Sequence, residues 1–588
     1  MTSAATDSAS DGTTTGTLPA GATAVGATAG ATAVSVRPVE PSTARRLDRN
    51  SWRNPALYAF LLALIPAIIM ARRVHQSTKM QYLDYWSSLL RFTNADGSIH
   101  PRGFFTYQNE HPFVVTQIIY YLDAKVLTGS NRELGYFSVL AALASLVILW
   151  RLLPARWSQL TQGLVLLAAS AIMFCPTGAW NFVKGMSGTA WLSANVFALL
   201  AVLLARRQRT ALALVAAALS ILTYGTGFAA PVAIIAVAVL RRDRWWRWAL
   251  PTGLLFGSLI VYKLTVNGTA TGQPVGHDPG LLLQTFLTNL STLWDPSGGS
   301  IGLVAGAAGL VVLGVGFVTY WQNQQEYADL VGIWGVAVYA IGASVLISLG
   351  RSEVFTGDGA QARYVSLSAL FWISVLVVAV RLARVQRELV VRAAVAVAAV
   401  AVFWGASPAL FAATIAESPL QNAMAAGVRF NATDPYTQRM QSPAAQIPRL
   451  KALHSYPFVD DYTLGCGLKP EATLDTATLK QLPASQFPNA GRVDKDRLVG
   501  TTREIDGWIY RAGHDLQCVA IIDTTGKIVG GGAGKMIRTD VPKLFSTYPD
   551  NTGFQAVTPS SESNVKLVLG FDDGLFTLPA TAVPTATK

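Results

Sequence analysis

The feature that most constrains this chain is a series of long apolar runs, since such segments fold only where lipid or a protein core surrounds them. A helix rises about 1.5 Å per residue, so about 20 apolar residues cross the hydrocarbon layer of a bilayer. The sequence therefore predicts a polytopic α-helical membrane protein with about eleven transmembrane helices. The candidate spans are 55–71, 134–153, 160–176, 190–205, 210–223, 226–240, 247–265, 301–320, 329–349, 364–380 and 391–413.

Charge supports this interpretation. Only 14% of the 588 residues are charged, whereas soluble domains carry about 25%. The net charge of +12 comes from Arg residues at the ends of the apolar runs, a pattern typical of membrane orientation. We therefore expect contact with membrane lipids and no binding of nucleic acid.

The N-terminus is predicted to lie in the cytoplasm. Residues 1–44 are rich in Ala, Thr, Gly and Ser, which predicts disorder, and the first residues lack the basic segment of a secretory signal. Arg45, Arg46, Arg49 and Arg53 precede the first run, and basic residues favour the cytoplasmic side, although Arg72 and Arg73 run against this orientation. An odd number of spans then places the tail outside the plasma membrane of a bacterium.

The chain divides into a membrane domain, 45–413, and an extracytoplasmic tail, 414–588. Alternating segments in the tail predict a small β-sandwich at about 500–585. It includes a hairpin with strands at 518–523 and 528–529 joined by a turn at 524–527, followed by a further turn at Gly530–Gly532. Cys466 and Cys518 both lie in the tail, and the sequence leaves open whether they form a disulfide.

The first outer loop, 72–133, carries structure of its own. Tyr82, Trp86 and Leu89 recur at helical spacing, which predicts a short amphipathic helix at the membrane interface. Residues 113–128 indicate a second surface or re-entrant helix. If that segment crossed the membrane instead, the tail would lie in the cytoplasm.

Asp84, at the start of this loop, is the first candidate for chemistry. A carboxylate at the membrane surface acts as a general base when a substrate hydroxyl lies within hydrogen-bond reach. Tyr85 and Trp86 are expected to anchor the helix and shape a pocket for an acceptor. The alternative is an interfacial Asp that faces water or caps a helix.

Glu110 and His111 form a second cluster. Such a pair positions an acceptor or binds a metal, and the alternative is a polar loop in which Pro112 begins the next helix. No metal-ligand spacing is convincing, so we predict neither a metal nor another cofactor.

Arg351 and Arg363 flank a Gly-rich outer loop and are candidates for binding a phosphate, since the guanidinium fork matches phosphate oxygens. Lys184, between Trp180 and Trp191, is a weaker candidate of the same kind. The alternative for the two arginines is headgroup anchoring at the ends of spans.

This layout resembles the GT-C-type glycosyltransferases of bacterial cell envelopes, integral-membrane enzymes that use polyprenyl-phosphate sugars. The resemblance rests on one span, a long outer loop with an acidic residue, and then many spans. It also rests on three short segments, Asn109-Glu110-His111, Ala362-Arg363-Tyr364 and Gly507-Trp508.

The resemblance implies an inverting transfer in which Asp84 deprotonates an acceptor hydroxyl and polyprenyl phosphate leaves beside Arg351 or Arg363. Many members carry two adjacent acids here, whereas Tyr85 follows Asp84 in this chain, so Glu110 is the substitute candidate for the base. The implied partners are a polyprenyl-phosphate-linked sugar and an envelope glycan acceptor, which the tail would bind through residues such as Trp508.

Two other functions stay open at this point. One is a non-enzymatic transporter or flippase of envelope lipids, although the spans carry few of the ionisable groups that ion-coupled transporters use. The other is a membrane scaffold with a glycan-binding β-domain. The sequence does not name the sugar, and arabinan, mannan and other polysaccharides all fit.

Overall fold

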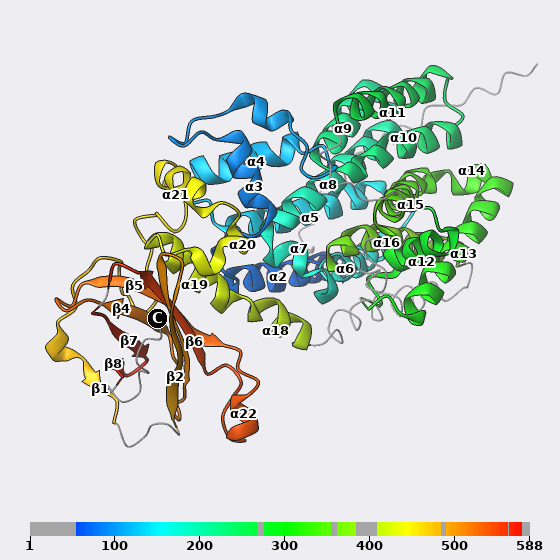
Figure 1. Cartoon of the computed structure of the whole chain (residues 1–588). Helices are drawn as coiled ribbons and strands as arrows, with labels where there is room; N and C mark the ends of the chain where they lie inside the picture. Colours follow the sequence, from blue (N-terminus) through cyan, green and yellow to red (C-terminus); the bar gives the residue numbers. More distant parts are fainter. Residues whose placement is uncertain are drawn as a thin grey trace, which may run out of the picture. The chain divides into compact units, whose positions relative to one another are not determined.

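The computed structural model describes residues 55–266, 276–295, 297–353, 361–383, 408–483, 490–562 and 564–578 (Figure 1). The predicted disorder of 1–44 and most of the predicted span 391–413 lie outside these residues. The helices that build the body of the protein are α1 (Pro55–Leu62), α2 (Ile65–Gln76), α5 (Asn131–Leu152), α6 (Gln159–Met173), α7 (Trp180–Val183), α8 (Gly185–Arg206), α9 (Thr210–Thr223), α10 (Ala229–Leu240), α11 (Trp246–Thr265), α12 (Pro279–Ser291), α13 (Ser300–Gln322), α14 (Gln324–Tyr327), α15 (Val331–Arg351) and α16 (Val365–Leu382).

Among the described residues, seven helical segments are long and apolar enough to cross a membrane: Pro55–Gln76, Asn131–Leu152, Gly185–Arg206, Trp246–Thr265, Ser300–Gln322, Gln324–Arg351 and Ala362–Leu382. The pair Gln159–Met173 and Pro176–Val183, bent by 44°, makes an eighth if it forms one broken span. These are fewer than the eleven predicted. The predicted spans 210–223 and 226–240 fall on helices that are apolar but shorter, because Gly225 and Gly227 interrupt the hairpin between them.

Small residues let these helices approach closely. This is common in membrane proteins, because the hydrophobic effect does not drive helices together in lipid. A Cβ atom added to Gly335 of α15 would lie 2.7 Å from Val237 of α10 and 2.8 Å from Val202 of α8. In the same contact, the Tyr339 hydroxyl donates to Asn195 Oδ1 of α8 over 2.8 Å. The centre of the bundle is therefore fixed by a close approach and a buried hydrogen bond.

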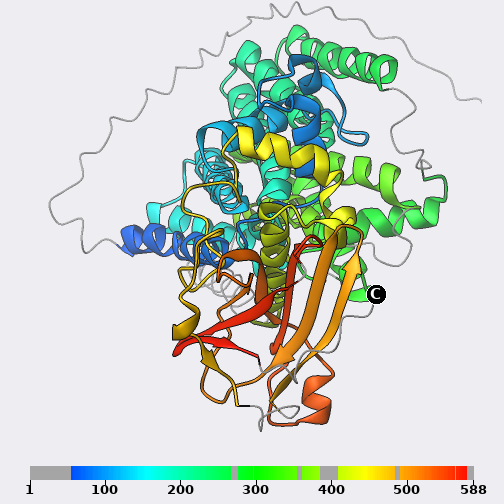
Figure 2. The ribbon, with the colours of Figure 1, turned by 60° about the vertical axis from the view of Figure 1, so that its left-hand side comes forward.

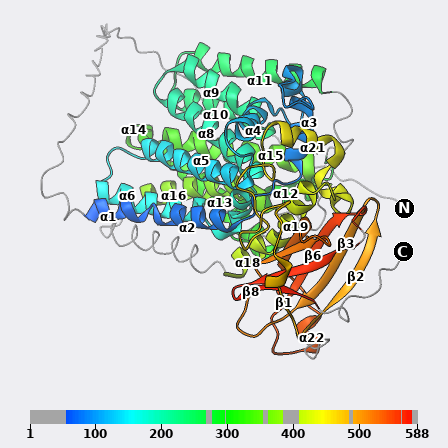
Figure 3. The same cartoon turned by 90° about the vertical axis from the view of Figure 1, so that its left-hand side faces the viewer.

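The first outer loop folds as α3 (Asp84–Phe92), the 3₁₀ helix η2 (Pro101–Phe105) and α4 (Val114–Val126). The apolar face of α3 is buried under protein, whereas the predicted amphipathic helix would turn this face toward lipid. Helix α4 and helix α21 (Pro443–Ala452) supply the cover, and Gln446 Nε2 of α21 donates to the Trp86 carbonyl over 2.6 Å. Figure 3 shows α3, α4 and α21 together.

The tail continues through α18 (Pro408–Ala416), α19 (Ser418–Arg429) and α20 (Thr437–Met440) into one eight-stranded sheet (Figure 2). The strand order is β1-β8-β7-β4-β5-β6-β3-β2, and every pairing is antiparallel except β1 with β8. The strands are β1 (Lys480–Gln481), β2 (Gly491–Val499), β3 (Thr502–Ile509), β4 (Cys518–Ile522), β5 (Ile528–Met536), β6 (Gly553–Pro559), β7 (Lys566–Phe571) and β8 (Gly574–Thr577), with a short helix α22 (Val541–Leu544) before β6.

A single sheet curved into a half-barrel replaces the predicted sandwich. Alternate residues of β4 explain how one sheet suffices: Ala520 and Ile522 pack in a cluster with residues of α19, while Val519 and Ile521 pack in a second cluster formed by the sheet itself. A helix therefore covers the face on which the prediction placed a second sheet.

The predicted hairpin at 518–529 is confirmed, because β4 pairs antiparallel with β5. The prediction of a turn at Gly530–Gly532 was wrong, since these glycines lie inside β5. Side chains there would collide: a Cβ on Gly531 would lie 2.6 Å from Leu464, which packs on the strand. Glycine in this position marks close approach rather than a turn.

Cys466 and Cys518 form a disulfide with Cα atoms 5.8 Å apart, which decides the question that the sequence left open. The bond ties the segment that follows α21 to the start of β4. It lies in the part of the chain that is predicted to face the oxidising side of the membrane.

Candidate functional site

A cavity of about 260 Å³ lies among helices of the body and brings together residues that are far apart in the sequence. Glu110 and His111 enter from the outer loop, Arg351 from the end of α15, and Arg363 from the 3₁₀ turn η6 (Ala362–Tyr364) before α16. Four of the predicted site residues therefore line one cavity, which we call the arginine cavity. Its other walls are mainly apolar and aromatic: Trp191, Tyr224, Phe228, Leu259, Tyr262, Leu346, Ile347, Leu349 and Tyr364.

A tight turn places Glu110 and His111 at the cavity. The Gln108 and His111 backbones exchange two hydrogen bonds, of 3.0 and 2.9 Å, and Asn109 between them adopts a φ of 52°. Asn tolerates this left-handed conformation better than most residues. The segment Asn109-Glu110-His111, which carried the resemblance, is therefore a turn that directs two polar side chains into the cavity.

Glu110 and Arg351, which carry opposite charges, are in contact in the arginine cavity. Glu110 Oε1 accepts a hydrogen bond from Arg351 Nη2, and it lies 3.3 Å from His111 Nε2. The His111 ring packs on Tyr224, with centroids 4.1 Å apart. Burial, and secondarily the charge of Arg363, lowers the pKa of His111 to about 3. His111 is therefore neutral at physiological pH, when its ring has one donor and one acceptor nitrogen, and Nε2 is the nitrogen that lies beside Glu110.

Asp84 begins α3, directly after Leu83, whose φ of 23° shows a strained entry into the helix. Burial raises the pKa of the Asp84 carboxyl. The charges of Arg363, Arg91 and Arg351 and a hydrogen bond from Gln108 act in the opposite direction. Asp84 does not line the arginine cavity itself, but it belongs to the same electrostatic cluster.

Gln108 was missed by the sequence reasoning. Its Oε1 accepts hydrogen bonds from Ser87 Oγ at 3.1 Å and from Arg91 Nη1 at 2.7 Å. The amide oxygen is therefore committed, and the group that Gln108 offers to Asp84 is its Nε2 donor. The only signal in the sequence was its position two residues before Glu110, which did not distinguish it from an ordinary loop residue.

The structure places the remaining predicted residues elsewhere. Tyr85 and Trp86 are completely buried in the core beneath α3, where Tyr85 packs on Tyr120 at 5.2 Å between centroids. Trp508 is buried against Phe545 and Tyr548 in the sheet. None of these three lines the arginine cavity, so a direct role in holding an acceptor there finds no geometric support.

Lys184 is also separate from the arginine cavity. It is buried, forms an ion pair with Glu417 at 2.8 Å, and lies 3.3 Å above the Trp180 ring. Burial lowers the pKa of Lys184, while Glu417 opposes that shift. These contacts tie the body to the residue that precedes α19.

Within the described ranges, one group of three side chains has the spacing of a metal site, namely His514, Asp572 and Asp573 in the sheet. Arg511 already forms two hydrogen bonds with Asp573, of 2.7 and 2.9 Å. The carboxylates at the arginine cavity do not form such a group among these residues.

No protein-family model matches this chain, and no curated protein is similar to it. The chemistry of the site must therefore be argued from its own geometry. A mainly apolar cavity that two arginine side chains line can bind an anionic group together with an apolar chain.

Proposed function

We propose that this protein is a GT-C-type membrane glycosyltransferase of the bacterial cell envelope. It would move a sugar from a polyprenyl-phosphate donor to a glycan or lipid-linked acceptor on the outer face of the membrane, with inversion of the anomeric carbon. The observation that carries the proposal is the convergence of Arg351, Arg363 and Glu110 in one apolar cavity beside Asp84.

The donor fits the cavity in two respects. Its phosphate would lie between Arg351 and Arg363, since guanidinium groups bind phosphate oxygens in a bidentate manner. The apolar wall, which includes Leu259, Leu346 and Leu349, would contact the first isoprene units. Glu110 would hold Arg351 in place through their ion pair.

Asp84 would act as the general base. The acceptor hydroxyl would transfer its proton to the Asp84 carboxylate while its oxygen forms a bond to the anomeric carbon. The bond from that carbon to the phosphate oxygen would break, and polyprenyl phosphate would leave with the electron pair. The arginines would stabilise the charge that develops on the leaving group.

The raised pKa of Asp84 favours this role, because a base is most effective when its pKa lies close to the working pH. Glu110 is less suited to it, since its carboxylate is engaged with Arg351 and His111. The disulfide between Cys466 and Cys518 agrees with an extracytoplasmic tail, because disulfides persist mainly in oxidising compartments.

The experiment is a comparison of envelope glycan linkages in cells that lack the protein, complemented with wild type, Asp84→Asn or Glu110→Gln. Membrane levels of each form are measured by immunoblot. We expect a linkage that disappears in the deletion strain and returns with wild type only. Full restoration by Asp84→Asn would exclude Asp84 as the base, and no change in any linkage on deletion would refute the transferase proposal.

A further inference from the structure

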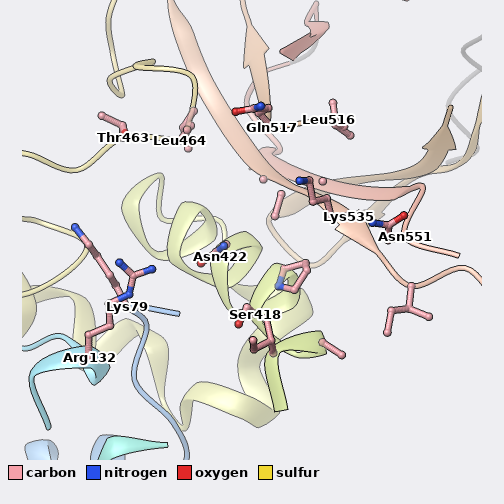
Figure 4. A pocket seen from close by; sticks show the side chains of 18 of the residues that line it. Lys79, Arg132, Ser418, Asn422, Thr463, Leu464, Leu516, Gln517, Lys535 and Asn551 are labelled. Carbon is pink, nitrogen blue, oxygen red and sulfur yellow. The ribbon is translucent and has the colours of Figure 1, made fainter. Parts of the chain in front are cut away.

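A second cavity, of about 940 Å³, lies between the outer loop and the sheet and shares no residue with the arginine cavity. Its walls come from the ends of two predicted spans, from α18 and α19, and from β5 with its neighbouring loops. Figure 4 shows Lys79 and Arg132 on one side, Lys535 and Asn551 on the other, and Ser418 between them. Its volume lies at the upper end of the range for small-molecule sites.

Lys79 and Arg132 are held in place by the backbone around them. The Asn131 amide donates to the Lys79 carbonyl over 2.8 Å, and Arg132 Nε donates to the Ser77 carbonyl over 2.7 Å. Lys79 follows the span Pro55–Gln76, and Arg132 begins the span Asn131–Leu152. The Arg132 guanidinium and the backbone of Lys79 are therefore held near the ends of two candidate spans.

Ser418 of α19 is the feature that indicates a ligand. The residue is only 8% exposed, and its Oγ is buried without a hydrogen-bond partner among the described residues. Asn422 lies one helical turn after Ser418, and its Oδ1 accepts a hydrogen bond from Thr78 Oγ1 at 3.2 Å. This bond places the same face of α19 next to Thr78, the residue before Lys79. A buried hydroxyl without a partner costs free energy, which a bound acceptor group would recover.

Two basic side chains of this cavity are available to an anion, those of Lys79 and Arg132. Lys535 also lines the cavity but is paired with Asp515 at 2.9 Å, and the carboxylates in the walls are those of Asp461 and Asp550. Asp461 is exposed and lies 3.8 Å from Lys79, a distance at which an incoming anion could replace it.

Apolar side chains complete the walls, among them Ile415 of α18, Leu516 and Ile537. A ligand that matches the whole cavity therefore combines an anionic head with an apolar portion. Phosphate is the anion whose oxygens best suit a lysine, an arginine and a hydroxyl donor at the same time.

We infer that this second cavity binds a phosphate group through Lys79, Arg132 and Ser418, either as the headgroup of an anionic lipid or as a free phosphate. The inference does not depend on the proposed transferase activity, because the two cavities use different residues. If the ligand is a lipid, the second cavity would anchor the protein to that lipid or regulate it at the place where the sheet meets the helical body.

The test uses the full-length protein in a neutral detergent. Binding of short-chain phosphatidylglycerol is measured by native mass spectrometry, with phosphatidylcholine as the zwitterionic comparison, and binding of inorganic phosphate by ³¹P NMR. The variants are Lys79→Gln, which changes an exposed side chain, and Ser418→Ala, which removes only the hydroxyl. Lys125→Gln is the matched control, because Lys125 is exposed on α4 and does not line the cavity.

We expect Lys79→Gln to weaken phosphatidylglycerol binding about tenfold, the equivalent of one charge-assisted hydrogen bond, while Lys125→Gln leaves it unchanged. Ser418→Ala should weaken it severalfold. If inorganic phosphate binds with the same dependence on Lys79, the ligand is a free phosphate, and if only the lipid binds, the ligand is a lipid headgroup. Equal binding by wild type and Lys79→Gln, or binding of phosphatidylcholine as tight as phosphatidylglycerol, would overturn the inference.

Discussion

The arginine cavity and the sheet pair their charges in different ways. In the sheet, Arg497 pairs with Glu504 at 2.8 Å and Arg503 with Asp496 at 2.7 Å, in each case across the neighbouring strands β2 and β3. In the cavity, Glu110 pairs with Arg351, which lies 241 residues further along the chain. The Arg497 side chain is 50% exposed, whereas that of Arg351 is 16% exposed.

This difference indicates what each set of charges does. Exposed cross-strand pairs are screened by water and contribute about 0–1 kcal/mol each. Charges gathered in an apolar cavity are costly to bury, and proteins keep them mainly where a ligand or a reaction uses them. The exposed Arg497 is therefore expected to tolerate substitution, and the cavity charges are not.

The largest expected effect comes from comparing one arginine in each region. Arg351→Gln should lower sugar transfer by about 100-fold or more, because it removes a donor to the leaving phosphate and leaves the half-buried Glu110 without its cation. Arg497→Gln should change transfer less than about twofold. The measurement is restoration of the missing linkage in deletion cells, normalised to membrane level. Equal losses in both variants would remove the distinction between the two regions.

Within the sheet region, the disulfide should dominate stability. Cys466→Ser opens a loop in which the two cysteines are 52 residues apart, and it should cost about 3–4 kcal/mol of unfolding free energy. Thermal unfolding of the purified protein, with and without reductant, measures this loss. Cys175→Ser is the control, because Cys175 is a free buried cysteine whose replacement leaves the response to reductant intact. Unfolding of wild type that is insensitive to reductant would contradict the prediction.

One carboxylate in the sheet has a pKa that burial raises, as it does that of Asp84. Burial, and secondarily the charge of Glu504, raises the pKa of Asp506 to about 6. The folded state therefore binds this proton more tightly than the unfolded chain, so stability falls as the pH rises from about 4 to 6 and stays reduced above 6.

Asp506→Asn should remove this penalty and stabilise the protein by about 2 kcal/mol at pH 7.5, with little gain at pH 4. Unfolding followed by tryptophan fluorescence at the two pH values measures the difference. A gain of equal size at both pH values would show that the effect does not arise from ionisation.

The smallest expected effect concerns the residue that orients Asp84. Gln108→Leu removes a donor that stabilises the Asp84 carboxylate, so the pKa of Asp84 should rise further and the acid limb of the transfer activity should move to higher pH. Activity at acidic pH should fall about tenfold, with a smaller loss at alkaline pH.

Gln117→Leu is the matched control for this change, since Gln117 is equally buried in the same loop but its Nε2 donates to the Thr106 carbonyl. A pH profile that moves equally in both variants would mean that Gln108 has only a structural role.

The sequence predicted structure correctly where the signal is local, in apolar runs or in residues that alternate along a strand. The apolar runs predicted the helical body, and the alternation around 518–529 predicted the hairpin of β4 and β5. Glu110, His111, Arg351 and Arg363 were identified because polar residues stand out at the ends of apolar segments, and they do line one cavity.

The errors arose where distant segments meet. The face of α3 was predicted to contact lipid because nothing in residues 84–92 shows that α21 covers it. The sequence predicted a turn at glycines 530–532. In the folded sheet these glycines pair with two neighbouring strands, and Gly531 lies close to Leu464, but these contacts come from distant segments and leave no local signal. Gln108 escaped notice because its partners, Ser87 and Arg91, lie on a separate helix.

The most direct test of the account is transfer in vitro with purified protein. Wild type and Asp84→Asn are supplied with a panel of polyprenyl-phosphate pentoses and hexoses and with envelope glycan from deletion cells, which lacks the linkage in question. We predict that wild type alone releases polyprenyl phosphate from one donor and forms a product of inverted anomeric configuration. Equal turnover by Asp84→Asn, or a product of retained configuration, would contradict the account.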